Sequence, residues 1–339
     1  MQLHPAPFHH EVADGPETGV AHWLTTSDGV RLRMGHWRVA PQDGPETGTE
    51  KGSEKGTEKG TVLLFPGRTE YIEKYGRTAA AFAARGYAML AMDWRGQGLA
   101  DRLLPERATG HVGRFTDYQH DVAAMCDAAE ALALPKPWFL LAHSMGGAIG
   151  LRALMSGLPV NAAAFSAPMW GILMSAVMRP TAWAMSWSSK KAGMGHVMTP
   201  GTRAETYVLA EAFEGNSLTH DRGMYEYMQA QMRLHPDLAL GGPSLHWLHE
   251  ALQDTLELSR KPAPEMPCVT FLGDQEKIVD PARIKARMAG WPGGELVMVD
   301  NGEHEVLMEV PAIREAIHDR CAALFDAHLT PRAGASLTA

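Results

Sequence analysis

A serine lies between an apolar, strand-like run and a helix-like run, where its hydroxyl could act as a nucleophile. Residues 138–142 form the apolar run, and residues 145–156 follow with the composition of a helix. Ala142 and Gly146, two positions to either side of Ser144, are small enough for the sharp turn that lifts a serine hydroxyl above a sheet edge. We therefore predict that Ser144 is a catalytic nucleophile. The alternative is that Ser144 only caps the helix.

A serine hydroxyl needs a general base, and the base needs a carboxylate that orients it. When the serine follows a strand in this way, the acid and the histidine come later in the chain. His304 lies in a turn between the apolar residues 296–299 and a final helix-like segment, and it is the predicted base. The segment after Gly273 offers two acids, Asp274 and Glu276, and the residues alone leave both open.

Hydrolysis through a serine also needs two backbone N–H groups that stabilise the oxyanion. Met145, at the start of the predicted helix, is one expected donor. Arg68, in the turn after the strand-like residues 61–65, is the other, through its backbone N–H and not its guanidinium. Gly67 permits close approach of the backbone to a substrate, and Glu70 could brace the turn. The alternative is a purely structural turn.

Strand-like and helix-like segments alternate along most of the chain, which predicts a mostly parallel sheet with helices on both faces. The expected strands are residues 30–39, 61–65, 87–92, 138–142, 160–165, 268–272 and 296–299, and the expected helices are 71–85, 115–134, 145–156 and 311–328. Active sites of such sheets lie at the carboxyl ends of the strands, where the residues singled out above are expected.

The alternation stops over residues 168–260, which are rich in Met and Trp and mostly helical in pattern. This stretch is too long for a loop, so we predict an inserted helical cap between two parts of one core, 1–167 and 261–330. Repeated Glu-Lys-Gly units predict a flexible low-complexity insertion at 41–60. Residues 331–339 are predicted to be a disordered tail.

Charge and cysteine content exclude several kinds of protein. Lys and Arg total 31 against 39 Asp and Glu, which gives a formal net charge of −8. An acidic chain is a poor candidate for nucleic-acid binding, because basic residues must neutralise the phosphates. The three cysteines are far apart in the sequence and predict neither a disulfide framework nor a zinc site. The chain shows no signal peptide and no apolar run long enough to cross a bilayer, so we expect a cytoplasmic protein.

Met and aromatic side chains crowd residues 169–187, at the start of the predicted cap. Because such side chains adapt to irregular apolar ligands, we predict that the cap holds an acyl chain, with Met169 and Trp170 touching the substrate. The alternative is that they only pack on the core. The apolar cap also predicts transient contact with a membrane surface, and no oligomeric state is predicted. Further predicted substrate contacts are Gly67, Glu70 and His143.

Several motifs together carry a resemblance to a known family. They are Phe65-Pro-Gly-Arg-Thr-Glu-Tyr71, Asp93-Trp-Arg-Gly-Gln-Gly98, Gly110-His-Val-Gly-Arg-Phe-Thr-Asp-Tyr118, Ala142-His-Ser-Met-Gly-Gly147 and Ala167-Pro-Met169, followed by the acid and histidine turns. Through them the chain resembles the lysophospholipase and monoglyceride-lipase branch of the α/β hydrolases, of serine aminopeptidase type. It is most similar to the bacterial lysophospholipase L2 group, over residues 5–328 without the insertion.

The resemblance implies an α/β-hydrolase fold, oxyanion donors at Arg68 and Met145, and no metal or organic cofactor. It implies that the substrate is an ester of one long acyl chain, either a lysophospholipid or a monoacylglycerol. In the family the triad acid lies three residues after the glycine that ends its strand, which is Glu276 here. Most relatives have Asp at that position, so Asp274 remains a rival. The alternatives are an amidase or aminopeptidase with the same triad, a short-chain esterase and a non-catalytic binding protein.

Overall fold

The computed structural model describes residues 3–40 and 58–330. The predicted tail and most of the predicted insertion lie outside these residues. The insertion was predicted to run to residue 60, and this end is wrong by a few residues. Glu58 accepts hydrogen bonds from the Arg38 guanidinium and the Val39 N–H, and Gly60 already belongs to a strand.

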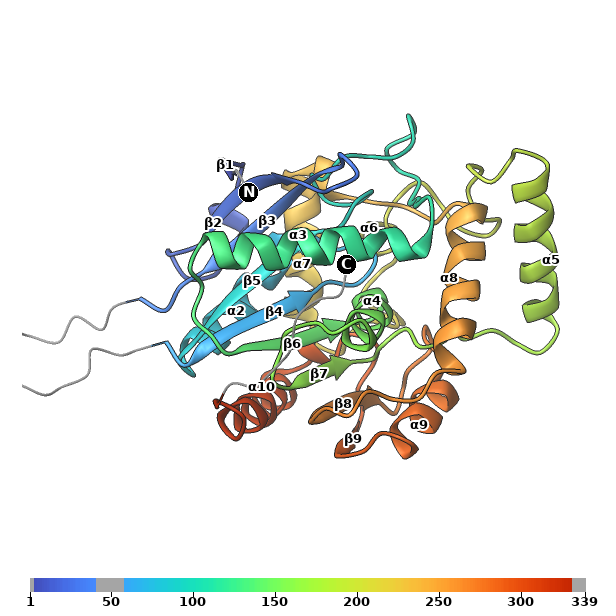
Figure 1. Ribbon diagram of the computed structural model, residues 1–339. Coiled ribbons are helices and arrows are strands. Elements are labelled where there is room, and N and C mark those ends of the chain that lie inside the picture. The colour runs from blue at the N-terminus through green and yellow to red at the C-terminus, as the bar shows by residue number, and fades with distance from the viewer. Residues whose placement is uncertain (1–2, 41–57, 331–339) are drawn as a thin grey trace, which may run out of the picture.

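The described strands form one sheet of nine, mostly parallel, as predicted (Figure 1). Their order across the sheet is β1-β2-β3-β5-β4-β6-β7-β8-β9. In this order, the pairs β1-β2, β2-β3 and β3-β5 are antiparallel. All later pairs, from β5-β4 to β8-β9, are parallel. The strands are β1 (His4–Pro5), β2 (Val20–Thr25), β3 (Arg31–Trp37), β4 (Gly60–Phe65), β5 (Tyr87–Asp93), β6 (Trp138–His143), β7 (Ala163–Ser166), β8 (Cys268–Gly273) and β9 (Gly294–Val299).

Helices cover both faces of this sheet because alternate strand residues point to opposite sides. Leu63 and Phe65 of β4 pack in one core cluster, while Val62 and Leu64 pack in the other. The first cluster draws on α3 (Tyr118–Ala131), α4 (Met145–Met155), α8 (Leu245–Ser259) and α9 (Pro281–Ala289), and the second on α2 (Gly76–Ala83), α7 (Arg222–Leu234) and α10 (Pro311–Asp326). The shorter pieces are α1 (His10–Ala13), α6 (Tyr207–Ala210) and the 3-10 turns η1 (Ile72–Tyr75), η2 (Phe115–Asp117), η3 (Pro236–Leu238) and η4 (Val306–Met308).

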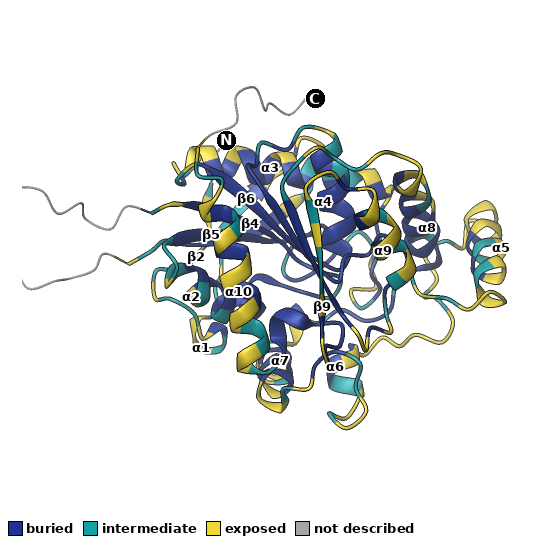
Figure 2. Ribbon diagram, turned by 90° about the horizontal axis from the view of Figure 1, so that it is seen from below, coloured by how far each residue is buried: buried dark blue, intermediate teal, exposed yellow. Residues whose placement is uncertain are grey.

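The stretch between β7 and β8 is helical, as expected, and has no sheet strand. Two of its helices, α7 and α8, pack against the core, and α5 (Met178–Lys191) packs on α8. In both ribbon views α5 stands at the edge of the molecule, and much of it is exposed (Figures 1 and 2). The boundaries of the cap as a separate domain stay a prediction. None of the described helices is long and apolar enough to cross a bilayer.

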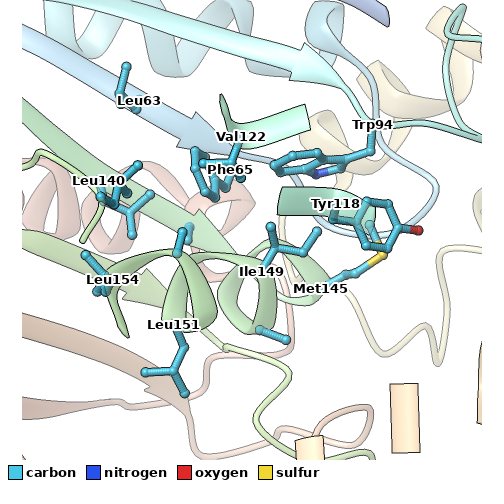
Figure 3. Packing of buried hydrophobic residues seen from close by; sticks show 14 of the residues in the cluster. Leu63, Phe65, Trp94, Tyr118, Val122, Leu140, Met145, Ile149, Leu151 and Leu154 are labelled. Carbon is cyan, nitrogen blue, oxygen red and sulfur yellow. The ribbon is translucent and has the colours of Figure 1, made fainter. Parts of the chain in front are cut away.

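Helix α4 is anchored to the sheet by large apolar side chains. Figure 3 shows Met145 and Ile149 of α4 beside Trp94 and Tyr118, close to Phe65 of β4. These side chains are at most 2% exposed. Burying each one stabilises the fold by about 1.5–3 kcal/mol. The packing therefore fixes the start of α4, where Ser144 lies.

A buried ion-pair network ties β3 to β5 and η1. The guanidinium of Arg33 bonds to Asp93 and Glu73, with N···O distances of 2.7 Å for both pairs and no exposure of any of the three side chains. Removing one partner of such a network leaves buried charges without compensation. We expect Arg33→Met to lower the free energy of unfolding by about 3–5 kcal/mol, measured by urea titration.

Arg31 offers a matched control, because it lies on the same strand but is 55% exposed in its pair with Asp101. An exposed pair contributes about 0–1 kcal/mol, so Arg31→Met should unfold almost like the wild type. If both variants lost the same free energy of unfolding, the buried network would contribute no more to stability than the exposed pair, which would contradict this prediction.

Candidate active site

Ser144 occupies a strained turn between β6 and α4. Its φ of 49° and ψ of −118° lie in a region that non-glycine residues rarely adopt. Hydrogen bonds hold the turn, since the Ser144 N–H donates to Ser166 O at 3.0 Å and the Ser144 carbonyl accepts from Gly147 and Met169 at 2.8 Å. A side chain at Gly146 would collide with the Phe65 carbonyl. Ala142 is fully buried and fits where the motif usually has glycine.

The histidine and one of the two candidate acids meet this serine in a continuous chain of hydrogen bonds. His304 Nε2 lies 2.9 Å from Ser144 Oγ, and His304 Nδ1 lies 2.7 Å from Glu276 Oε2. Glu276 Oε1 also accepts the N–H groups of Ile278 at 2.6 Å and Val279 at 3.0 Å. The predicted triad residues Ser144, His304 and Glu276 are therefore together and buried.

The electrostatics of Glu276 suit an orienting carboxylate. Burial alone would raise its pKa, but the His304 imidazole and the two N–H donors offset this, so the pKa lies below its ordinary value. The carboxylate is thus ionised at neutral pH and can hold the imidazole with Nε2 toward the serine.

Asp274, the rival acid, is not brought to His304. It is exposed, and its backbone N–H donates to Val299 O at 3.1 Å. Gly273 explains the close approach of the two loops, because a side chain there would collide with the Gly302 carbonyl beside His304. The chain then turns after Gly273, and the turn directs Glu276 inward.

The two expected oxyanion donors are available. Within the described chain, the backbone N–H groups of Arg68 and Met145 have no hydrogen-bond partner. The turn around Arg68 is braced as expected, because Glu70 accepts the Gly67 N–H and the Gln97 amide donates to Gly67 O at 2.9 Å.

A buried cluster of four titratable groups lies beside this turn. Lys74 bridges Glu70 and Glu305, and His143 Nε2 lies 3.3 Å from Glu305 and 3.6 Å from Glu70. Burial alone would lower the pKa of His143, but the two carboxylates raise it above its ordinary value. Burial would raise the pKa of Glu305, but His143 and Lys74 hold it well below. The cluster therefore pairs two carboxylates with the Lys74 ammonium and favours the protonated form of His143.

Lys74 and Glu305 were missed by the sequence reasoning. The spacing of Glu70 and Lys74 is that of a helical ion pair, which was the one available signal. Glu70, His143 and Glu305 are also metal-ligand types close enough to share an ion. The Lys74 ammonium already bonds to both carboxylates, so the group does not fit a resident metal.

A cavity of about 460 Å³ opens at Ser144 and His304. Of the other predicted substrate contacts, Glu70 and His143 line this cavity, whereas Gly67 does not and packs against both of their side chains. Part of the wall is apolar and comes mainly from the region between β7 and β8. These apolar residues are Val208, Leu218, Met228, Met232 and Leu240.

Neither Met169 nor Trp170 lines this cavity, and their contact with the substrate stays a prediction. Trp170 turns into the core, where its Nε1 donates to Gly147 O at 3.1 Å and its ring packs on Phe165 and Trp291. None of residues 169–187 lines the cavity, and the cap residues that do lie later in the chain.

The sheet, the strained serine and the later acid and histidine loops define an α/β hydrolase. Residues 56–311 match the family described as serine aminopeptidase, S33, and the chain belongs to this family. It is 31% identical to lysophospholipase L2 of Escherichia coli strain K12 over 286 residues. This alignment covers 80% of this chain and 81% of that protein. It is 30% identical over 258 residues to a probable lysophospholipase L2 of Haemophilus influenzae, and this alignment covers 76% of this chain and 80% of that protein. The predicted resemblance is confirmed.

Solved structures share the fold. A soluble variant of monoglyceride lipase from Saccharomyces cerevisiae aligns with a TM-score of 0.70 at 20% identity, over 96% of this chain and 100% of that one. A carboxyl esterase from Bacillus coagulans aligns with a TM-score of 0.67 at 13% identity, over 93% of this chain and 100% of that one.

Proposed function

We propose that this protein is a serine hydrolase that cleaves carboxylic esters of single-acyl lipids through an acyl-enzyme. The observation that carries the proposal is the buried chain from Glu276 through His304 to Ser144, which opens into a partly apolar cavity. The names of the relatives, lysophospholipase L2 and monoglyceride lipase, support the same substrate class.

In this mechanism His304 Nε2 takes the proton of Ser144 as Oγ attacks the ester carbonyl. Glu276 keeps the imidazole in the required tautomer and stabilises its charge. The N–H groups of Arg68 and Met145 stabilise the oxyanion, and the N-terminus of α4 adds its dipole. His304 then gives the proton to the leaving alcohol. Water, activated by His304, releases the fatty acid.

The apolar wall formed by Val208, Leu218, Met228, Met232 and Leu240 is the proposed site of the acyl chain. Methionine side chains are flexible and fill irregular apolar space, which suits a chain of variable shape. The proposal places acyl recognition on this wall and not on residues 169–187.

Met232→Trp should reduce the room for a long chain. We expect kcat/KM for a long-chain ester to fall about tenfold relative to a short-chain ester, because apolar pockets discriminate by about 1–3 kcal/mol per methylene. Met178→Trp is the control, since Met178 lies on α5 and is 63% exposed. If Met178→Trp shifted the preference for long-chain esters and Met232→Trp did not, the acyl chain would be bound elsewhere.

A substrate panel tests the proposed function. It compares a lysophospholipid and a monoacylglycerol of one chain length with an acetyl ester and an aminoacyl amide. We expect hydrolysis of the long-chain esters in preference to the other two. Preferential cleavage of the amide would favour the aminopeptidase-type alternative, and equal rates on acetyl and long-chain esters would favour a short-chain esterase.

Contact with a lipid surface and a cytoplasmic location stay predictions. Residues that suit such contact lie on and beside α5, where large apolar side chains are exposed. They are Leu173, Val177, Met178, Trp187, Met194 and Val197.

A further inference from the structure

Arg68 is a cation at the catalytic cavity, and its guanidinium has no acidic partner among the described residues. Arg68 lines the same cavity as Ser144 and His304, and among the described residues no carboxylate forms an ion pair with it. Burial lowers its pKa to about 10, and no carboxylate compensates for this loss of hydration. The group remains cationic at neutral pH. Arg68 is only half-buried, so its unpaired donors are open to a ligand as well as to water.

The surroundings hold the Arg68 guanidinium in place but leave most of its donors free. Nη1 donates to Gly241 O at 2.8 Å, and Cζ lies 5.7 Å from the centre of the Trp247 ring. Gly110 makes room for it, because a Cβ there would lie 3.1 Å from Nη1. A guanidinium has five N–H donors. Only one of the five is used within the described chain.

Other arginines with little exposure make more polar contacts within the fold than Arg68 does. Arg33 and Arg95 pair with carboxylates. The pKa of Arg102 is also lowered by burial, but its guanidinium donates to three carbonyls. Those carbonyls belong to Gly96, Asp237 and Ala239. Of these four arginines, Arg68 is the one that lines the catalytic cavity, and it uses only one of its donors within the described chain.

The charges around Arg68 favour an anionic ligand. The carboxylates of Glu70 and Glu305 are engaged by Lys74 and lie beside His143 in the buried cluster described above. Farther out, Arg203 pairs with Glu211, and Glu205 is exposed to solvent. In the part of the chain that the structure describes, Arg68 is thus the cation of the cavity lining that has no carboxylate partner of its own.

We propose that the Arg68 side chain binds the phosphate of a lysophospholipid head group, so that this site prefers a phosphate-bearing single-acyl lipid to a neutral monoacylglycerol. The inference rests on the proposed function and names its substrate class. A guanidinium offers parallel N–H donors that match two phosphate oxygens, and it binds phosphate strongly where water is excluded. The backbone N–H of the same residue would serve the oxyanion, so head group and reacting carbonyl would be held from one turn.

Binding of uncleavable ligands tests this inference without relying on catalysis. The ligands are an ether-linked lysophosphatidylcholine and an ether-linked monoalkylglycerol of the same chain, each below its micelle concentration, followed by tryptophan fluorescence. We expect Arg68→Met to weaken the phosphate-bearing ligand at least about tenfold more than the neutral one, since hydrogen bonds to charged groups contribute about 1.5–3 kcal/mol each. Arg68→Lys keeps the charge without the planar fork and should give an intermediate ratio.

Two controls exclude other sources of the effect. Arg260→Met removes the same charge from an exposed position outside the cavity and should leave the ratio at the wild-type value. Inorganic phosphate is titrated alone. If it bound in an Arg68-dependent way while the two lipids bound alike, the site would take free phosphate and the head-group proposal would be overturned. Equal weakening of both lipids in Arg68→Met would overturn it as well.

Hydrolysis rates then separate this inference from the proposed function. For ester substrates of one chain length, the ratio of kcat/KM for lysophosphatidylcholine to that for monoacylglycerol should fall at least about tenfold in Arg68→Met. Wild-type protein that hydrolysed only the monoacylglycerol would overturn the Arg68 inference and leave the proposed function standing. If wild-type protein hydrolysed neither, the proposed function would fail, and the binding experiment would still decide on Arg68.

Discussion

Ser144→Ala is expected to lower kcat/KM for a long-chain ester by about 10⁴- to 10⁶-fold, because the nucleophile is lost while binding and the oxyanion donors remain. Alanine can replace serine in the strained turn without a new clash, so the thermal midpoint should stay close to that of the wild type. Steady-state hydrolysis of a monoacylglycerol or lysophospholipid measures the effect.

Ser27 provides a control for this substitution. It belongs to a second Ser-x-Gly triplet, Ser27-Asp28-Gly29, but it is exposed and its hydroxyl lies 3.0 Å from His120. Ser27→Ala should retain wild-type activity. Hydrolysis by Ser144→Ala at more than about one hundredth of the wild-type rate would assign the chemistry to another residue.

Glu276→Gln should lower kcat by up to about 10⁴-fold with little change in KM, because an amide that donates to Nδ1 leaves the imidazole in the wrong tautomer. The pair of neighbouring acids makes the test sharp. Asp274→Asn changes the same charge two residues away, at an exposed position with no contact to His304. We expect Asp274→Asn to retain most of its activity. The reverse pattern would make Asp274 the triad acid.

The lowered pKa of Glu276 adds a pH dependence with a definite sign. A depressed carboxyl pKa contributes to folding stability fully above the unfolded value, and this contribution is lost as the pH falls through the folded value. The stabilisation from Glu276 should therefore be complete above pH 4.5 and decline only below it. Glu276→Gln should lack this decline in acid unfolding curves.

The serine, the histidine and the parallel sheet were predictable because each depends on local pattern and chain order. A strand, a small-residue turn and a helix are contiguous around Ser144, and His304 follows a late strand. The choice between Asp274 and Glu276 was less accessible, since both lie after the same strand and only the direction of the turn separates them. That direction depends on the contact between Gly273 and Gly302, which are distant in sequence.

The cavity wall could not be predicted from composition. Met169 and Trp170 were expected at the substrate because of their residue types, but composition does not indicate which way a side chain points. Both follow β7 directly and are drawn into the core beside α4. The wall instead comes from residues 201–242, which fold over the site through long-range contacts. The cluster of Glu70, Lys74, His143 and Glu305 escaped prediction for the same reason.

The most direct test of the central claim is the mass of the protein after reaction with a fluorophosphonate, followed by identification of the modified peptide. An activated serine hydroxyl should take up one phosphonyl group on Ser144, and His304→Ala should take it up far more slowly because the base is missing. Modification at another residue, or equal labelling of wild-type protein and His304→Ala, would contradict a nucleophile activated by that imidazole.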